Sequence, residues 1–271
     1  MKREKLRKAH SDLVSFLKLL VADESNTDLK EEDLLKNLEW ELGRLSLIFK
    51  YIEEQIKDEK QPLELLEIGI GLALVTTSLS SCFGKTALNI KAVEHPERTY
   101  LSYKNFINHL NRTNVDLKTF DIVCERWPYS DSAFDIVVFS ETLEHIPPTQ
   151  VPFVLEQISR ILKNNGILIC TSPNMAYWRV RWKVLRGKSP FDAAIPLDWA
   201  GGTYAHIRLY TITELISLCD LYNLNKLDYQ YAHFGIKYKN GIIALLKKII
   251  YQILPATSPE FILVAVKCSN P

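Results

Sequence analysis

The chain has 271 residues, of which 47% are hydrophobic, and its formal net charge is +1. This length and composition suffice for one α/β domain with a substantial core and some additional segments. A chain so close to neutral lacks the strongly basic character of dedicated nucleic-acid-binding domains, so no nucleic-acid partner is expected.

The cysteines and the apolar runs bear on the compartment. Five cysteines are far apart and form no C-x-x-C pair, so we predict neither a disulfide framework nor a zinc site, and we expect reduced thiols in the cytoplasm. No signal peptide is recognised, because Ser15 and Lys18 interrupt the first apolar run. No stretch reaches the roughly 18 apolar residues that a membrane span requires.

Residues 1–60 are expected to form a helical extension. Between Leu34 and Ile52, apolar residues recur at spacings of three and four, which is typical of an amphipathic helix. The polar stretch Asp23–Asp33 predicts a break between two helices. The extension could cover an active site, mediate a homodimer or simply pack on the sheet, and we favour packing.

From residue 61 to residue 271, predicted strands and helices alternate. This order is typical of a parallel, doubly wound α/β sheet. The expected strands are Leu63–Ile68, Ala87–Val93, a strand within Val115–Val123, Phe134–Phe139, Ile167–Cys170, Leu227–Tyr231 and Glu260–Lys267. The expected helices are Ala73–Phe83, Arg98–Leu110, Val151–Leu162, which Asn165-Gly166 ends, and Thr213–Leu221.

Two segments interrupt this alternation. Residues 175–210 carry three tryptophans and several arginines, and a segment of this length predicts a functional insertion on the substrate side. Residues 236–256 form an apolar helical insertion before the last strand, whose run 241–254 is too short to cross a bilayer. We favour packing of this run on the core or in a dimer interface. The alternative is contact with a membrane surface or a lipid-linked substrate.

The stretch from Leu65 to Leu79 predicts a ligand site. Its apolar run ends at Ile68, Gly69 and Gly71 follow one residue apart, and a helical sequence comes next. Glycines let the backbone turn sharply and let a ligand approach closely. The helix directs its free N–H groups and its positive dipole end at the same point, outside the carboxyl end of a strand. An ordinary strand–turn–helix connection is the alternative.

This turn has the pattern E-x-G-x-G-x-(G/A), which resembles motif I of the class I S-adenosylmethionine-dependent methyltransferases. Leucine at position 74 replaces the third glycine of a dinucleotide-binding turn. The resemblance implies a Rossmann-like, seven-stranded class I methyltransferase sheet whose last two strands form an antiparallel hairpin at its edge. It also implies that S-adenosyl-L-methionine (SAM) is the cofactor. The residues that would lie along its methionine part are Glu67, Gly69, Ile70, Gly71 and Ala73.

Further cofactor contacts are expected at the ends of the next two strands. Glu94 ends the second strand, where a carboxylate can accept hydrogen bonds from both ribose hydroxyls; the alternative is a solvated loop acid. His95 would lie near the ribose or the adenine edge. By the resemblance, Asp121 would accept a hydrogen bond from the adenine amine and Ile122 would pack on the adenine ring.

The segment Ser140–His145 follows the fourth strand and would lie beside the cofactor. Its E-x-L-E-H pattern resembles the corresponding motif of methyltransferases that act on quinones, sugars and related metabolites. The resemblance implies that Ser140 contacts the cofactor and Glu141 the substrate. His145 could act as general base on a substrate hydroxyl, since the pKa of histidine is near the working pH. The alternative is a structural histidine that holds this loop.

A second candidate base lies in the first insertion. The order His206, Arg208, Tyr210 before a helix resembles the H-x-R-x-(Y/F) run of sugar and polysaccharide-pathway methyltransferases. His206, Arg208 and Tyr204 would then face the substrate, with Arg208 binding an anionic or hydroxylated group. The alternative is a cluster around Glu214 that anchors the loop. We see no acidic cluster beyond the cofactor acids, so no metal is expected.

The sequence therefore predicts a SAM-dependent O-methyltransferase. Its expected partner is a small-molecule acceptor, a sugar or another hydroxylated metabolite, and polysaccharide biosynthesis is one such setting. Because the cofactor carries an activated methyl group, the protein needs mainly to position the acceptor and exclude water. Two other functions remain open. One is an NAD-dependent oxidoreductase, which the missing glycine disfavours, and the other is a non-catalytic module that uses this fold to bind a partner.

Overall fold

The structure is a computed structural model that describes residues 2–26, 29–57, 59–191, 195–197, 202–204, 206–232, 245 and 249–268. The strands are β1 Leu63–Ile68, β2 Leu88–Glu94, β3 Asp116–Thr119, β4 Phe134–Ser140, β5 Leu162–Pro173, β6 Ile195–Leu197, β7 Gly202–Tyr204, β8 Leu224–Ala232 and β9 Glu260–Lys267. The helices are α1 Lys2–Val21, α2 Glu31–Ile56, α3 Leu74–Phe83, α4 Lys104–Thr113, α5 Val151–Ile161, α6 Trp178–Leu185 and α7 Ile212–Asp220. The short 3₁₀ helices are η1 Thr99–Ser102, η2 Leu143–His145 and η4 Pro255–Thr257.

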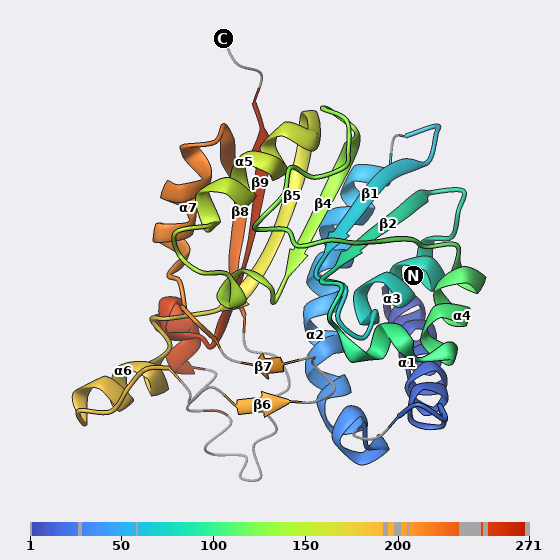
Figure 1. The fold of residues 1–271 in the computed structure, drawn as a ribbon. Coiled ribbons are helices and arrows are strands. Elements are labelled where there is room, and N and C mark those ends of the chain that lie inside the picture. The colour runs from blue at the N-terminus through green and yellow to red at the C-terminus, as the bar shows by residue number, and fades with distance from the viewer. Residues whose placement is uncertain are drawn as a thin grey trace.

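Seven of the strands form one twisted sheet in the order β3-β2-β1-β4-β5-β9-β8 (Figure 1). The first five strands of this order pair in parallel, and β9 pairs antiparallel with both β5 and β8. β1 and β4 are buried on both faces at the centre, where their aliphatic residues form a nearly continuous apolar run. The predicted doubly wound sheet with an antiparallel edge hairpin is therefore confirmed.

Helices cover both faces of the sheet. One apolar core joins the sheet to α1, α2, α3 and α4, and a second core joins the other face to α5 and α7 (Figure 1). Leu13, Phe16, Ile48 and Phe49 of the N-terminal helices are fully buried in the first core. The prediction that residues 1–60 pack on the sheet domain as two helices is thus confirmed.

Two of the predicted elements differ clearly from the structure. The expected helix Arg98–Leu110 is split into η1 and α4, because Tyr103 between them has an extended backbone. The Tyr100 hydroxyl of η1 donates to the Glu94 carboxylate. Asn165-Gly166 lies inside β5 rather than ending α5. A Cβ at Gly166 would lie 3.0 Å from the Asp135 carbonyl oxygen, so this glycine is needed where the backbones of β4 and β5 approach closely.

The apolar segment before β9 is only partly described, and residues 233–244 and 246–248 lie outside the described residues. Tyr251 is buried and accepts a hydrogen bond from Trp178 Nε1 of α6. Leu245, Ile253 and Leu254 are more than half exposed, so packing on the core accounts for only part of this segment. Among the described residues, no helix combines the length and apolar character that a membrane crossing needs.

Candidate active site

The glycine turn follows β1 directly and is held against β2. Gly69 and Gly71 both have positive φ angles, +74° and +52°. A Cβ at Gly69 would lie 2.8 Å from Thr142 Cγ2, so this position tolerates no side chain, whereas a Cβ at Gly71 would meet no atom within 4 Å. The first glycine allows close packing against the loop after β4, and the second keeps the space in front of the turn open.

Glu94 joins the turn to the end of β2. Its carboxylate accepts hydrogen bonds from the Gly71 backbone N–H at 2.8 Å and from the Tyr100 hydroxyl at 2.7 Å. The His95 backbone N–H donates to the other carboxylate oxygen, and Arg98 Nε lies 3.6 Å from it. Glu94 is 5% exposed, so it is not a solvated loop acid. The turn and the carboxylate are therefore held in a fixed relative position.

Two cavities meet at this turn. One of about 270 Å³ is lined by Glu67, Gly69, Ile70, Gly71, Ser140 and Glu141, together with Glu41 and Arg44 of α2. The other, of about 300 Å³, is lined by His95, Asp121, Ile122 and Ile207 among others. Glu94, Thr142 and His145 line both. A larger cavity of about 760 Å³, between α1, α3 and α4, contains none of the predicted site residues, so size alone does not identify the site.

A buried charge cluster closes the first cavity. Arg44 of α2 contacts Glu41, and its Nη1 lies 3.6 Å from Glu141 Oε2. Burial opposes the charge of this guanidinium, but the neighbouring carboxylates of Glu41, Glu141, Glu260 and Glu144 raise the pKa of Arg44 above its usual value. Burial raises the pKa of Glu144 and of Glu260 well above the usual value for glutamate. One guanidinium thus faces four carboxyl groups at the edge of the sheet and can balance only part of their charge.

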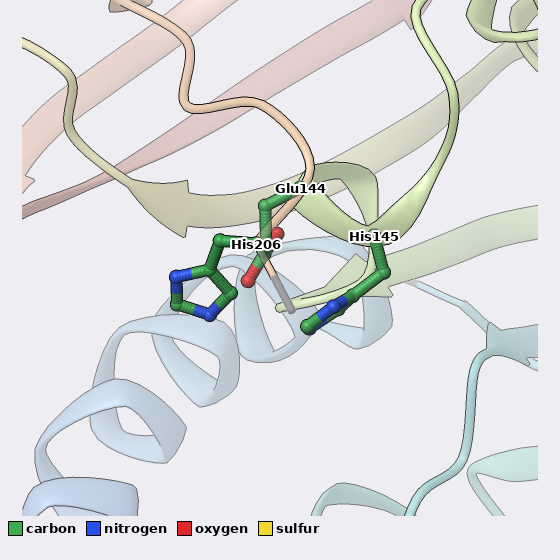
Figure 2. A group of neighbouring side chains, drawn as sticks. All are labelled: Glu144, His145 and His206. Atoms are coloured by element: carbon green, nitrogen blue, oxygen red, sulfur yellow. The ribbon is translucent and has the colours of Figure 1, made fainter. Parts of the chain in front are cut away.

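The two candidate bases lie side by side. The ring centroids of His145 and His206 are 5.1 Å apart, with Glu144 adjacent to both (Figure 2). The backbone N–H groups of Ile207 and Arg208 donate to the Glu144 carbonyl oxygen at 2.8 and 3.2 Å. These bonds dock the segment before α7 onto η2, and so bring together two histidines that lie far apart in the sequence.

Comparisons of the fold agree with the sheet topology. A SAM-dependent methyltransferase from Methanosarcina mazei matches with a TM-score of 0.54 and 13% identity, over 83% of this chain and 98% of that one. One from Archaeoglobus fulgidus matches with a TM-score of 0.52 and 13% identity, over 85% and 98%. The [4+2]-cyclase SpnF matches with a TM-score of 0.54 and 15% identity, over 96% and 94%. At these identities the likeness establishes the class I methyltransferase fold. No curated protein matches the sequence significantly.

A family model described as "Methionine biosynthesis protein MetW" matches residues 100–242, which is more than half of the chain. The chain belongs to the MetW family. The match includes Asp121, the segment Ser140–His145 and His206, but it begins after the glycine turn and Glu94. In this MetW-family protein, the fold places the turn and Glu94 against the matched part.

Most predicted site residues of the MetW-family protein gather around the two cavities. Ala73 is an exception, because it is fully buried and lines neither cavity; its left-handed φ of +57° shapes the turn instead. Arg208 forms an ion pair with Glu214 and lies 4.9 Å from the centre of the Tyr210 ring, which fits the alternative of a loop-anchoring cluster. The backbone of Tyr204 belongs to β7, but its side chain lies outside the described residues.

Several residues at the cavities were not predicted. Glu41 and Arg44 come from α2, so the N-terminal extension also covers the site of the MetW-family protein, besides packing on the sheet. Tyr100 and Arg98 follow β2 and contact Glu94. In the sequence, the only signal for Arg44 is a charged residue within the apolar pattern of α2. This signal is weak, because a charged residue on a helix ordinarily indicates a solvated face.

Glu67 predicts a pH dependence of stability. Burial raises the pKa of Glu67 to about 8 from an ordinary value of 4.5, against the opposing effect of the hydrogen bond from Thr76. Between about pH 5 and pH 8 the folded protein therefore holds a proton that the unfolded chain releases, so the free energy of unfolding falls as pH rises, by up to ~1.4 kcal/mol per pH unit. Glu67→Gln, which keeps an acceptor for Thr76, should flatten this slope in urea unfolding measured at pH 5, 6.5 and 8.

Glu125→Gln is the matched control, because Glu125 is exposed, and it should leave the pH dependence of the free energy of unfolding unchanged. An identical pH slope in the wild type and in Glu67→Gln would mean that Glu67 is ionised in the folded protein across this range.

Proposed function

We propose that this MetW-family protein is a SAM-dependent methyltransferase that methylates a hydroxyl group of a small molecule, with sugars as the first candidates. The observation that carries the proposal is the buried Glu94 carboxylate, bonded to the Gly71 backbone N–H between two adjoining cavities. A carboxylate in this position can accept hydrogen bonds from ribose hydroxyls while a glycine turn leaves space for the rest of the ligand.

The two cavities suit the two halves of the cofactor. The methionine part would lie in the 270 Å³ cavity, and its carboxylate would face Arg44, whose buried Nε has no hydrogen-bond partner among the described residues. The N-terminus of α3 adds the positive end of its dipole, and the Ala73 side chain makes no capping hydrogen bond there. The adenine would lie in the 300 Å³ cavity beside Asp121 and Ile122.

His145 is the residue best placed to act on an acceptor, because it lines both cavities. The cofactor would supply the methyl group on its sulfonium. An imidazole nitrogen of His145 would take the proton of the acceptor hydroxyl as the acceptor oxygen bonds to the methyl carbon; the sulfur–methyl bond would break and S-adenosylhomocysteine would leave. His206 lies next to His145 and would help to orient the acceptor. The walls formed by α2 and by the segment 206–210 would restrict water at the reacting groups.

Two other functions are to be distinguished from this one. A dinucleotide-binding oxidoreductase would need room for a pyrophosphate close to the turn, but Leu74 replaces the third glycine and lines the first cavity. A non-catalytic module remains the second candidate, because the fold alone does not determine the function. The similar fold of a [4+2]-cyclase is one example of this.

The test is transfer of a tritiated methyl group from SAM to a panel of monosaccharides, polyols and phenols, with primary amines as the comparison. We expect labelled ether products and S-adenosylhomocysteine, with kcat reduced roughly 100-fold in His145→Ala while SAM still binds. Label in amines alone would contradict hydroxyl specificity. Tight SAM binding without transfer to any acceptor would favour the non-catalytic module.

A further inference from the structure

Three metal-ligand side chains converge beside the cofactor cavities. Glu144 and His145 lie in η2, directly after β4, and His206 lies in the segment before α7. One ligand atom of each residue lies within 4.8 Å of the other two. Figure 2 shows the Glu144 carboxylate between the two imidazole rings, above α2. A single ion could therefore contact all three residues after small side-chain rotations.

The backbone holds these residues in place. The Glu144 carbonyl oxygen accepts from the backbone N–H groups of both Ile207 and Arg208, so the segment that carries His206 is fixed to η2. The His145 backbone N–H donates to the Thr142 carbonyl oxygen at 3.1 Å. Ser172 Oγ donates to Glu144 Oε2 at 3.3 Å from the end of β5, which orients the carboxylate as outer-shell partners do at metal sites.

The Glu144 carboxylate carries the second, independent observation. Glu144 is fully buried, and its Oε1 atom has no hydrogen-bond partner within the part of the chain that the structure describes. A buried carboxylate oxygen without a partner is costly, since water no longer solvates it. The adjacent Glu260 is also buried and has no hydrogen-bond partner for either oxygen among the described residues. Arg44 thus balances only part of the negative charge that these carboxyl groups carry when ionised, and a bound cation would balance more of it.

We propose that Glu144, His145 and His206 bind a divalent first-row transition-metal ion. Two imidazoles and one carboxylate form the ligand set of catalytic zinc sites and of non-haem iron sites, and this set leaves coordination positions open. Because His145 lines both cavities, an oxygen ligand at an open position would lie beside the proposed methyl donor. Such an ion would bind the acceptor hydroxyl and lower its pKa, so that the hydroxyl proton would pass to solvent water rather than to an imidazole nitrogen. This proposal departs from the metal-free site that the sequence predicts.

Metal binding is tested on the full chain after treatment with a chelator. Zn²⁺ is titrated by calorimetry, and Co²⁺ by visible absorption, where d–d bands report histidine and carboxylate ligands and a sulfur charge-transfer band would report binding to the free cysteines. We expect one ion per chain and no sulfur band. His206→Ala and Glu144→Gln should each weaken binding roughly 100-fold or more, while His10→Ala, at an exposed position of α1, should leave it unchanged.

His206 is only partly buried, so His206→Ala keeps the test informative if Glu144→Gln does not fold. Failure of the wild type to bind either ion would overturn the proposal and leave a Glu144–histidine ion pair as the role of this group. Binding that is equal in the wild type, His206→Ala and His10→Ala would place the ion elsewhere and would also overturn it. Neither readout depends on methyl transfer, so the result is separate from the fate of the proposed activity.

Discussion

Arg44→Met is expected to lower the free energy of unfolding at pH 7 by about 3–5 kcal/mol, because it leaves buried carboxyl groups without their guanidinium partner. Arg44 is buried against Glu41 and lies near Glu141, Glu144 and Glu260. Methionine fills a similar volume, so the loss should report charge rather than packing. Urea unfolding followed by circular dichroism measures it.

Arg126→Met is the matched control for this experiment. The Arg126 side chain is 74% exposed and lies 3.6 Å from Asp131, so its removal should change the free energy of unfolding by less than about 0.5 kcal/mol. The double variant Arg44→Met/Glu41→Gln should recover part of the loss, since it removes one of the carboxyl groups that lost their partner. A loss below about 1 kcal/mol in Arg44→Met would show that these carboxyl groups are already neutral at pH 7.

Glu94→Gln is expected to weaken SAM binding roughly 100-fold, or about 2.7 kcal/mol. The glutamine has the same shape, but its amide group replaces one acceptor oxygen with a donor. That donor would face either the His95 N–H or the Gly71 N–H and Tyr100 O–H groups, so the turn would lose its tether as well as its bond to the ribose. Calorimetric titration with SAM measures the change.

The neighbouring Glu97→Gln serves as the control, because Glu97 is exposed and lines neither cavity. It should bind SAM as tightly as the wild type. Thermal unfolding of both variants separates a loss of affinity from a loss of folded protein. An unchanged SAM affinity in Glu94→Gln would show that this carboxylate serves only to hold the glycine turn.

The features that depend on local sequence patterns were predicted well. The bounds of β1 were correct, and the turn at Gly69 and Gly71 has the positive φ angles that motivate glycine there. The positions of Glu94 and His145 followed from the rule that parallel strands present their carboxyl ends at one edge of the sheet. Each of these features depends on residues that are close in the sequence or that end a clearly apolar strand.

The features that were missed depend on contacts between distant segments. Arg44 reaches the site only because α2 packs across this edge of the sheet, which its helical pattern does not reveal. His206 was predicted as a site residue, but its position beside His145 depends on backbone N–H groups of its own segment that bond the Glu144 carbonyl oxygen. Asn165-Gly166 has the composition of a helix stop, yet β5 accommodates it with a positive φ at Asn165. Backbone docking and close strand contacts of this kind leave no local sequence signal.

The most direct test of the central claim is calorimetric titration of the purified protein with SAM, S-adenosylhomocysteine and NAD. It should be made on the wild type and on Gly71→Asn, because asparagine tolerates the left-handed backbone and Gly71 lines the first cavity, where a Cβ would meet no atom within 4 Å. The account predicts micromolar binding of both sulfur nucleosides to the wild type, weaker binding to the variant and no binding of NAD. The account would be contradicted if neither sulfur nucleoside bound to the wild type, or if NAD bound more tightly than they do.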